Sequence, residues 1–243
     1  MLDRIIVINL KRRADRKQAI IKQLDSNCTI PFSFFNAIDG LKIDDEYLKT
    51  HDISTFNKWK IEKSHSLLNK EQEERYYNRD INKGEIACTL SHHYVWKMIV
   101  EQKIEYTLIL EDDAIPILPV WQMLIDMQLE KLSQANINWD LLYAGRQQLM
   151  SDQGRLTPSI IQPGYSWTSH AYILSIRGAK KLLKSNLLEQ LIPVDEYLPA
   201  MQGEHPRRDI RHLFQNFQKL NAFALTPNLF IQKSVGKQSD IEE

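Results

Sequence analysis

The sequence contains few cysteines and no excess of charge of either sign. Its two cysteines, Cys28 and Cys88, form no recognisable motif. Isolated cysteines are more often small buried residues than a disulfide or a metal-binding pair, so we expect a reducing environment and no disulfide framework. Lysine plus arginine and aspartate plus glutamate number 31 each, which gives no electrostatic reason to expect nucleic acid as a partner.

Long apolar runs are also missing. No segment reaches the roughly 18–20 apolar residues that cross a bilayer, so we expect no transmembrane segment. Residues 1–8 lack the apolar core and cleavage site of a signal peptide. We therefore expect a soluble, cytoplasmic protein, whose only membrane contact would be peripheral. The 43% of hydrophobic residues can build a real core, and 243 residues fit one large domain better than two small ones.

The apolar pattern predicts an α/β fold. Residues 4–9 form a β-branched run typical of a buried strand, residues 14–24 carry apolar positions that suggest a helix, and residues 32–37 predict a second strand. This β-α-β order predicts a parallel sheet with helices on its faces. The later elements that we expect are strands at 106–110, 140–144 and 170–174, a helix at 177–185, and two short apolar pieces between 223 and 232.

A charged stretch interrupts this pattern before a well-marked helix. Residues from about 42 to 82 have few regular apolar positions, and we expect an irregular insertion or lid there. Asn82 then caps a helix, because Glu85 follows three residues later in the capping-box position. The apolar face of this helix is expected to carry Ile86, Leu90, Tyr94 and Met98.

Three consecutive carboxylates, Glu111, Asp112 and Asp113, follow the strand expected at 106–110. Ligands of open α/β sheets bind at the carboxyl ends of the strands. Adjacent carboxylates repel one another unless a positive group lies close to them. Mg²⁺ and Mn²⁺ are suitable positive groups, because they prefer oxygen ligands and bridge to phosphates. The pattern therefore favours a divalent-cation site, with a merely solvated acidic turn as the alternative.

Five ordered motifs carry a family resemblance. They are IVINLKRR at 6–13 with Asp15 and Arg16, KGEIACTLSH at 83–92 with Trp96, LILEDD at 108–113, IPVDEYLPAM at 192–201 with His205 and Pro206, and SDI at 239–241. Together they resemble glycosyltransferase family 25, which includes bacterial lipooligosaccharide galactosyltransferases and animal procollagen galactosyltransferases. The motif at 192–201 resembles the procollagen branch in particular. Ala87 stands where the family commonly has glycine, and QKS at 232–234 replaces a histidine-containing segment of that branch.

The resemblance implies a GT-A-like, Rossmann-like nucleotide-sugar-binding sandwich with a mostly parallel central sheet. Residues 1–243 would form a single catalytic domain. The donor implied is a UDP-sugar, usually UDP-galactose, which reacts with an acceptor hydroxyl and inverts at the anomeric carbon. The acceptor would be a collagen-type hydroxylysine or a lipooligosaccharide or other glycan. Mn²⁺ or Mg²⁺ on Glu111 and Asp113 would neutralise the charge of the diphosphate leaving group.

Further candidates for the site follow from the same resemblance. Inversion by single displacement needs a base on the acceptor hydroxyl, for which Asp195 is the first candidate and Glu196 the second; one of them could instead only cap a helix. The candidates for donor binding are Asn9, Arg12, Arg13, Arg16, Lys83, Gly84 and Asp112. The arginines suit phosphate but could belong to a solvated helix face. The candidates for substrate contact are Tyr165, Trp167 and His92, with core packing as the alternative.

Other functions remain open at the level of sequence. The same scaffold could transfer glucose or N-acetylglucosamine from its UDP-sugar, or hydrolyse a nucleotide sugar. A non-catalytic module that binds glycan or nucleotide is the alternative from another class. Retention of the carboxylates at 111, 113, 195 and 196 argues against that module, because a domain without catalysis has no need of them. The oligomeric state does not follow from the sequence.

Overall fold

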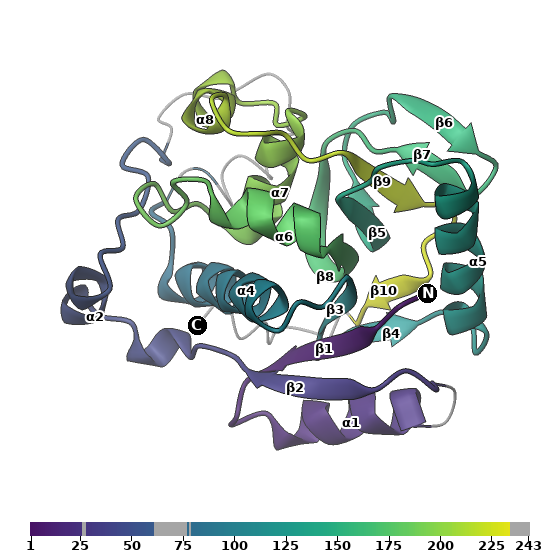
Figure 1. The fold of residues 1–243 in the computed structure, drawn as a ribbon. Helices are drawn as coiled ribbons and strands as arrows, with labels where there is room; N and C mark the ends of the chain where they lie inside the picture. Colours follow the sequence, from purple (N-terminus) through teal and green to yellow (C-terminus); the bar gives the residue numbers. More distant parts are fainter. Residues whose placement is uncertain (26–27, 61–76, 78, 234–243) are drawn as a thin grey trace.

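The computed structural model describes residues 1–25, 28–60, 77 and 79–233 (Figure 1). It contains an eight-stranded sheet with the strand order β2-β1-β3-β8-β5-β9-β7-β6, and a small second sheet of β4 and β10. The strands are β1 Arg4–Asn9, β2 Phe32–Asn36, β3 Tyr106–Glu111, β4 Ala114–Pro116, β5 Leu141–Gln148, β6 Gly154–Thr157, β7 Ile160–Gln162, β8 Ser166–Ser175, β9 Ala222–Leu225 and β10 Phe230–Gln232.

Most strands of the large sheet point in one direction. Strand β1 pairs in parallel with β2 and β3, and β5 pairs in parallel with β9. Strand β8 runs antiparallel to both β3 and β5, and β7 runs antiparallel to β9 and β6. Only β8 and β7 are therefore reversed within this sheet. The α/β fold class with a mostly parallel central sheet, predicted from the sequence, is confirmed.

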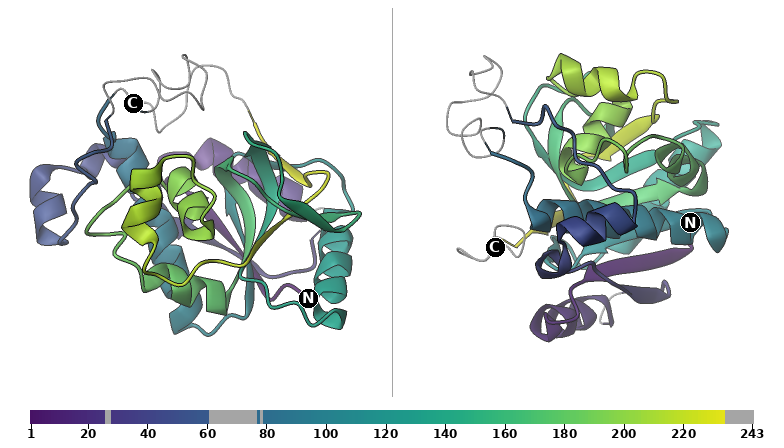
Figure 2. Two further views of the ribbon diagram at one scale, coloured as in Figure 1. Left: turned by 90° about the horizontal axis from the view of Figure 1, so that it is seen from above. Right: turned by 90° about the vertical axis from the view of Figure 1, so that its left-hand side faces the viewer.

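Helices cover both faces of the sheet (Figures 1 and 2). Alternate residues of β1 enter two separate hydrophobic clusters: Ile6 and Ile8 enter one, and Ile5 and Val7 enter the other. This explains the unbroken β-branched run, because a strand buried on both faces needs apolar residues at every position. The helices are α1 Ala14–Asp25, a 3₁₀ turn η1 Gly40–Lys42, α2 Asp45–Thr50, α4 Lys83–Glu101, α5 Trp121–Gln134, α6 Ile176–Leu183, α7 Val194–Gln202 and α8 Arg208–Phe214.

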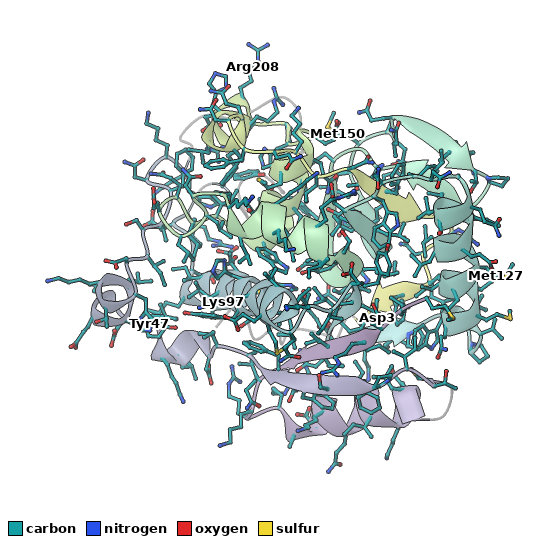
Figure 3. The ribbon with its side chains drawn as sticks, in the orientation of Figure 1. Asp3, Tyr47, Lys97, Met127, Met150 and Arg208 are labelled. Atoms are coloured by element: carbon teal, nitrogen blue, oxygen red, sulfur yellow. The ribbon has the colours of Figure 1, made fainter. Side chains whose placement is uncertain are left out.

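The two faces of the sheet are covered by different helices. Helices α4, α6, α7 and α8 supply buried side chains to the cluster of Ile6 and Ile8, whereas α1 and α5 supply the cluster of Ile5 and Val7. The outer sides of α8 and α5 face solvent, as Arg208 and Met127 do in Figure 3, whereas α7 has no exposed residue. Among the described helices, none is both long enough and apolar enough to pass through a bilayer.

Local sequence signals account for several boundaries. Asn82 accepts a hydrogen bond from the backbone N–H of Glu85, whose side chain accepts one from the backbone N–H of Asn82, so the predicted capping box is confirmed. Ser175 caps α6 by accepting from the backbone N–H of Gly178. Strand β8 begins earlier than the 170–174 predicted, because its polar first residues pair with the equally polar end of β5.

The stretch from about 42 to 82 is only partly described. Its described residues include α2 and a parallel bridge between Thr55 and Leu191. The motif at 239–241 lies outside the described residues.

Candidate active site

The carboxyl ends of β1 and β3 bring three of the expected site residues together. Asn9 ends β1, and Glu111, the last residue of β3, lies beside Ile8 in the parallel register. The side-chain amide of Asn9 donates to Asp112 Oδ2 at 2.7 Å. Arg16, in the first turns of α1, donates from Nη1 to Asp112 Oδ1 at 3.0 Å. Both oxygens of Asp112 are therefore held by groups that the sequence suggested for donor binding.

The negative charge of Asp113 is less completely compensated by hydrogen-bond donors and cations than the charge of Asp112. Its Oδ2 lies 3.5 Å from Arg16 Nη1 and 3.3 Å from Gln232 Nε2. Its Oδ1 is buried and has no hydrogen-bond partner among the described residues. Burial and the neighbouring charge of Glu111 raise the pKa of Asp113 to about 7. A buried carboxylate oxygen without a donor is the kind of group that a bound cation would satisfy.

Glu111 is the charged centre of this group. The Ser169 hydroxyl donates to Glu111 Oε1 at 2.7 Å, and His92 Nε2 lies 3.5 Å from the same oxygen. Burial opposes ionisation, but the nearby His92 ring and the Ser169 hydroxyl hold the pKa of Glu111 below its ordinary value. The negative charge of Glu111 in turn raises the pKa of its neighbours.

Asp195, from the first turn of α7, faces this group from the opposite half of the chain. Burial, followed by the charge of Glu111, raises the pKa of Asp195 to about 7, against the effect of hydrogen bonds from Ser169. Its Oδ1 is buried and lacks a hydrogen-bond partner within the described part of the chain. The two segments that sequence assigned to metal and base therefore meet at one place, with Ser169 in contact with both.

Sequence reasoning missed Ser169. It lies in a bulge of β8, where the register with β5 shifts between the pairs Gly145–Ala171 and Gln147–Trp167. The preceding Thr168 has φ 76°, a strained conformation for a β-branched residue. Strain of this kind concentrates at functional sites. The local signal was the group of polar residues Ser166, Thr168 and Ser169, which precede the strand predicted at 170–174.

A pocket opens beside the carboxylates. Its apolar side comes from the ends of β1 and β2, with Leu10, Ala37 and Ile38, and its acidic side from residues 111–113. The first turns of α4 form a further wall that includes Gly84. The backbone approaches closely here, since a Cβ on Gly40 would lie 3.0 Å from Gly84 Cα. An apolar pocket with convergent polar groups at the carboxyl end of a sheet is the usual place for a ligand in α/β proteins.

Residues 2–198 match the family model described as glycosyltransferase family 25 (LPS biosynthesis protein). The chain belongs to glycosyltransferase family 25. It is 29% identical over 231 residues to procollagen galactosyltransferase 2 of Homo sapiens, covering 93% of this chain and 34% of that protein. It is 33% identical over 231 residues to a glycosyltransferase 25 family member of Drosophila melanogaster, covering 94% of this chain and 35% of that protein.

A third relative of family 25 differs in what its name says about activity. The chain is 29% identical over 230 residues to a bovine (Bos taurus) protein named probable inactive glycosyltransferase 25 family member 3, covering 93% of this chain and 36% of that protein. The chain thus spans about a third of the length of these curated relatives. The family predicted from the five motifs is confirmed, while activity and substrates are matters for a proposal.

Within the family segment at 192–201, Glu196 occupies a very different environment from Asp195. Its carboxylate is buried and accepts from Tyr77 hydroxyl at 2.9 Å, Tyr165 hydroxyl at 2.7 Å and Trp167 Nε1 at 2.9 Å, and it pairs with His205 Nε2 at 2.6 Å. Burial opposes ionisation, but these groups, His205 foremost, hold the pKa of Glu196 below its ordinary value. Glu196 is thus fully compensated by its surroundings.

The aromatic candidates are part of this arrangement, which we call the Glu196 cage (Glu196, Tyr77, Tyr165, Trp167 and His205). Tyr165 and Trp167 were expected to stack on a sugar, but they are 1% and 7% exposed. Their polar atoms point inward because Glu196 needs donors in an apolar interior. The alternative of core packing, weighed from the sequence, describes both residues better.

The remaining candidates lie at different depths around the pocket. His92 is fully buried, with Nδ1 2.8 Å from the Tyr172 hydroxyl, so it reaches Glu111 from the interior and not a substrate at the surface. Arg12 pairs with Asp39 at 3.2 Å, and Arg13 pairs with Asp15 at 2.8 Å. The structure thus brings Arg16 to the carboxylates, and places the other two in ion pairs near the start of α1. The exposed Lys83 begins α4 beside the pocket.

Proposed function

We propose that the chain transfers a hexose, galactose in the first instance, from a UDP-sugar to an acceptor hydroxyl with inversion, in a reaction that depends on Mn²⁺ or Mg²⁺. Residues 1–243 would act as one catalytic domain, with an irregular insertion or lid at about 42–82. The observation that carries the proposal is a group of three carboxylates near the carboxyl end of the sheet in a family 25 chain. Glu111 has a lowered pKa, and Asp113 and Asp195 beside it are only partly compensated.

The residues at this site fit a hard divalent cation. Glu111 and Asp113 offer carboxylate oxygens, and the buried Oδ1 of Asp113 lacks a donor from the described residues. Oxygen ligands are those that Mg²⁺ and Mn²⁺ prefer. When bound, such an ion supplies Lewis-acid stabilisation of the charge that develops on the diphosphate. Asn9 and Arg16 fix the carboxylate of Asp112. In this proposal Asp112 contacts the ribose or the sugar of the donor.

The pocket supports the expected binding of the nucleotide. Leu10, Ala37 and Ile38 line the same pocket as the acidic residues and would provide an apolar wall for the nucleoside. Lys83 and Gly84 at the start of α4 suit a phosphate, because the first N–H groups of a helix carry partial positive charge. Arg12 and Arg13, which follow β1, would add positive charge at the pocket's edge.

Asp195 is the better candidate for the base that takes the proton from the acceptor hydroxyl. One of its oxygens has no hydrogen-bond partner among the described residues, and its pKa of about 7 suits general-base catalysis near neutral pH. Glu196 has the opposite properties, because both of its oxygens already accept two hydrogen bonds each. Its role in the proposal is to anchor the first turn of α7.

The names of the relatives guide the choice of substrates. Because relatives of this chain are named procollagen galactosyltransferases, we propose UDP-galactose as the donor and a hydroxylysine-containing protein as the acceptor. A lipooligosaccharide or another glycan is the second choice of acceptor. The test is release of UDP from a panel of UDP-sugars with Mn²⁺, with and without a hydroxylysine peptide. Faster release from UDP-galactose on adding the peptide is expected.

Other outcomes of this panel would identify the alternatives. Preferential release from UDP-glucose or UDP-N-acetylglucosamine would correct the sugar. Tight UDP binding without release from any donor would contradict catalysis and indicate a non-catalytic binding module, the reading that the name of the bovine relative invites.

A further inference from the structure

Two side chains of α4 and one of β3 converge next to the pocket. Cys88 and His92 are four residues apart and therefore lie on one face of α4. The Cys88 sulfur, a ring nitrogen of His92 and a carboxylate oxygen of Glu111 all lie within 4.8 Å of one another. We propose that these three residues bind a thiophilic divalent cation of the Zn²⁺ class, at a site that shares Glu111 with the all-oxygen site proposed above.

His92 provides the first argument. The ring is fully buried, and its Nε2 has no hydrogen-bond partner among the residues that the structure describes. Its other nitrogen, Nδ1, is fixed 2.8 Å from the Tyr172 hydroxyl, which also accepts from Trp96 Nε1 at 2.9 Å. A buried polar nitrogen left without a partner is costly, and a ring oriented through its other nitrogen is typical of metal-binding histidines.

The spacing of the ligand atoms provides the second argument. His92 Nε2 lies 3.5 Å from Glu111 Oε1, which is long for a hydrogen bond. Two ligands of a tetrahedral zinc ion, each about 2.0–2.2 Å from the metal, are about 3.4 Å apart. The observed separation therefore suits two ligands of one ion. The Ser169 hydroxyl orients Glu111 by donating to it at 2.7 Å.

Cys88 decides the class of cation. A thiolate with an imidazole selects Zn²⁺ and similar ions over Mg²⁺ and Mn²⁺, which favour oxygen. Cys88 lines the pocket, so an ion from solvent has a path to it. Burial, followed by the charges of Glu111, Asp195 and Asp113, raises the pKa of the Cys88 thiol well above its ordinary value, so the ion must displace the thiol proton when it binds. Three protein ligands would leave the fourth position of a tetrahedral ion to water or another ligand.

The shared ligand has a consequence for activity. An ion held by Cys88, His92 and Glu111 occupies the carboxylate that the hard cation of the proposed reaction needs. Zn²⁺ should therefore inhibit transfer supported by Mn²⁺, and the inhibition should depend on Cys88. This consequence rests on the proposed function, whereas binding of the ion itself does not.

Cobalt(II) spectroscopy tests the binding directly, with Co²⁺ as a coloured substitute for Zn²⁺. We expect the wild-type protein to show a thiolate-to-cobalt charge-transfer band, which excess Zn²⁺ abolishes. Cys88→Ser should lose the band, and the matched variant Cys28→Ser, which changes the other cysteine, should keep it. Calorimetry should show Zn²⁺ binding weakened in both Cys88→Ser and His92→Gln by at least about 10–100-fold, the usual cost of losing only an outer-shell partner of a metal ligand.

Several results would overturn the proposal. They are absence of the band in the wild type, its persistence in Cys88→Ser, or its loss in Cys28→Ser while circular dichroism reports a folded protein. A second assay measures how Zn²⁺ inhibits transfer supported by Mn²⁺, with the rate of each variant normalised to its own rate without Zn²⁺. Equal inhibition of wild type and Cys88→Ser would overturn the sharing of Glu111. If the wild type transfers no sugar, the cobalt spectrum still decides the site, so the two proposals fail separately.

Discussion

Asp195 and Glu196 are neighbours in the first turn of α7, and their surroundings differ in almost every respect. Glu196 is inside a cage of four donors and is held ionised. Asp195 has one buried oxygen without a partner among the described residues, and the charge of Glu111 helps to raise its pKa to about 7. The first environment stabilises a fold, whereas the second keeps a carboxylate reactive, because perturbed and partly compensated groups concentrate at functional sites.

Asp140 is a fully compensated carboxylate away from the pocket. It is completely buried, and its carboxylate accepts from Arg177 Nε at 2.7 Å, Lys181 Nζ at 2.6 Å and the backbone N–H of Asn221 at 2.7 Å. These contacts join β5, α6 and the segment before β9. The incomplete compensation of Asp113 and Asp195 is therefore a local property of the pocket and not a general feature of buried carboxylates in this chain.

Asp113→Asn should have the largest effect on activity. The substitution keeps the shape of the side chain and removes the charge that would bind the hard cation, so transfer should fall below detection in a UDP-release assay. Because burial and the charge of Glu111 disfavour the ionised form of Asp113, the melting temperature of the metal-free protein should stay equal or rise. EDTA should reproduce the loss in the wild type. Activity of the wild type in EDTA would contradict the role of the metal.

Asp195→Asn should come next, with a fall in kcat of about 10²–10⁴, the usual cost of losing a positioned general base. Binding of the UDP-sugar should change little, since Asp195 lies on the acceptor side in our proposal. The stability of the metal-free protein should stay equal or rise, because the substitution removes repulsion from Glu111. A kcat within a few-fold of wild type would exclude Asp195 as the base.

Glu196→Gln should reverse this pattern. The amide cannot replace a charge that pairs with the buried His205, so the free energy of unfolding should fall by about 3 kcal/mol. The folded fraction should keep kcat within a few-fold, as measured by denaturant titration alongside the transfer assay. If kcat collapsed while stability was unchanged, the base would be Glu196 and our comparison of the two neighbours would be wrong.

The smallest effect should appear in the pH dependence of stability. The pKa of Asp113 is about 7 in the folded protein against an ordinary value of 3.8. The folded state therefore keeps a proton that the unfolded state loses above about pH 4, so in EDTA the free energy of unfolding should fall as pH rises from about 4 to about 7. Urea titrations at about pH 5 and about pH 8 should show a smaller fall in Asp113→Asn. An unchanged fall would contradict the assigned pKa.

Local signals predicted the frame of the site. The strand at 4–9, the strand that ends at Glu111 and the capped helix from Asn82 follow from apolar runs and capping residues that lie close in sequence. Their order was enough to place the carboxylates at the carboxyl end of the sheet, because parallel strands end at the same edge.

Long-range contacts explain what the sequence did not predict. Sequence alone could barely separate Asp195 from Glu196, since the cage is assembled from residues 77, 165, 167 and 205. The same aromatic residues were expected at a sugar because their partner was unknown. Ser169 was missed because its position depends on a β-bulge, which no short-range pattern of the sequence indicates.

Calorimetry of UDP binding tests the central claim most directly, namely that the partly compensated carboxylates hold a cation for a nucleotide diphosphate. UDP is titrated into wild type and Asp113→Asn, first in EDTA and then with Mn²⁺. We predict that Mn²⁺ tightens UDP binding to the wild type by at least about tenfold and leaves the affinity of Asp113→Asn unchanged. Equal affinity of the wild type with and without Mn²⁺ would contradict the claim.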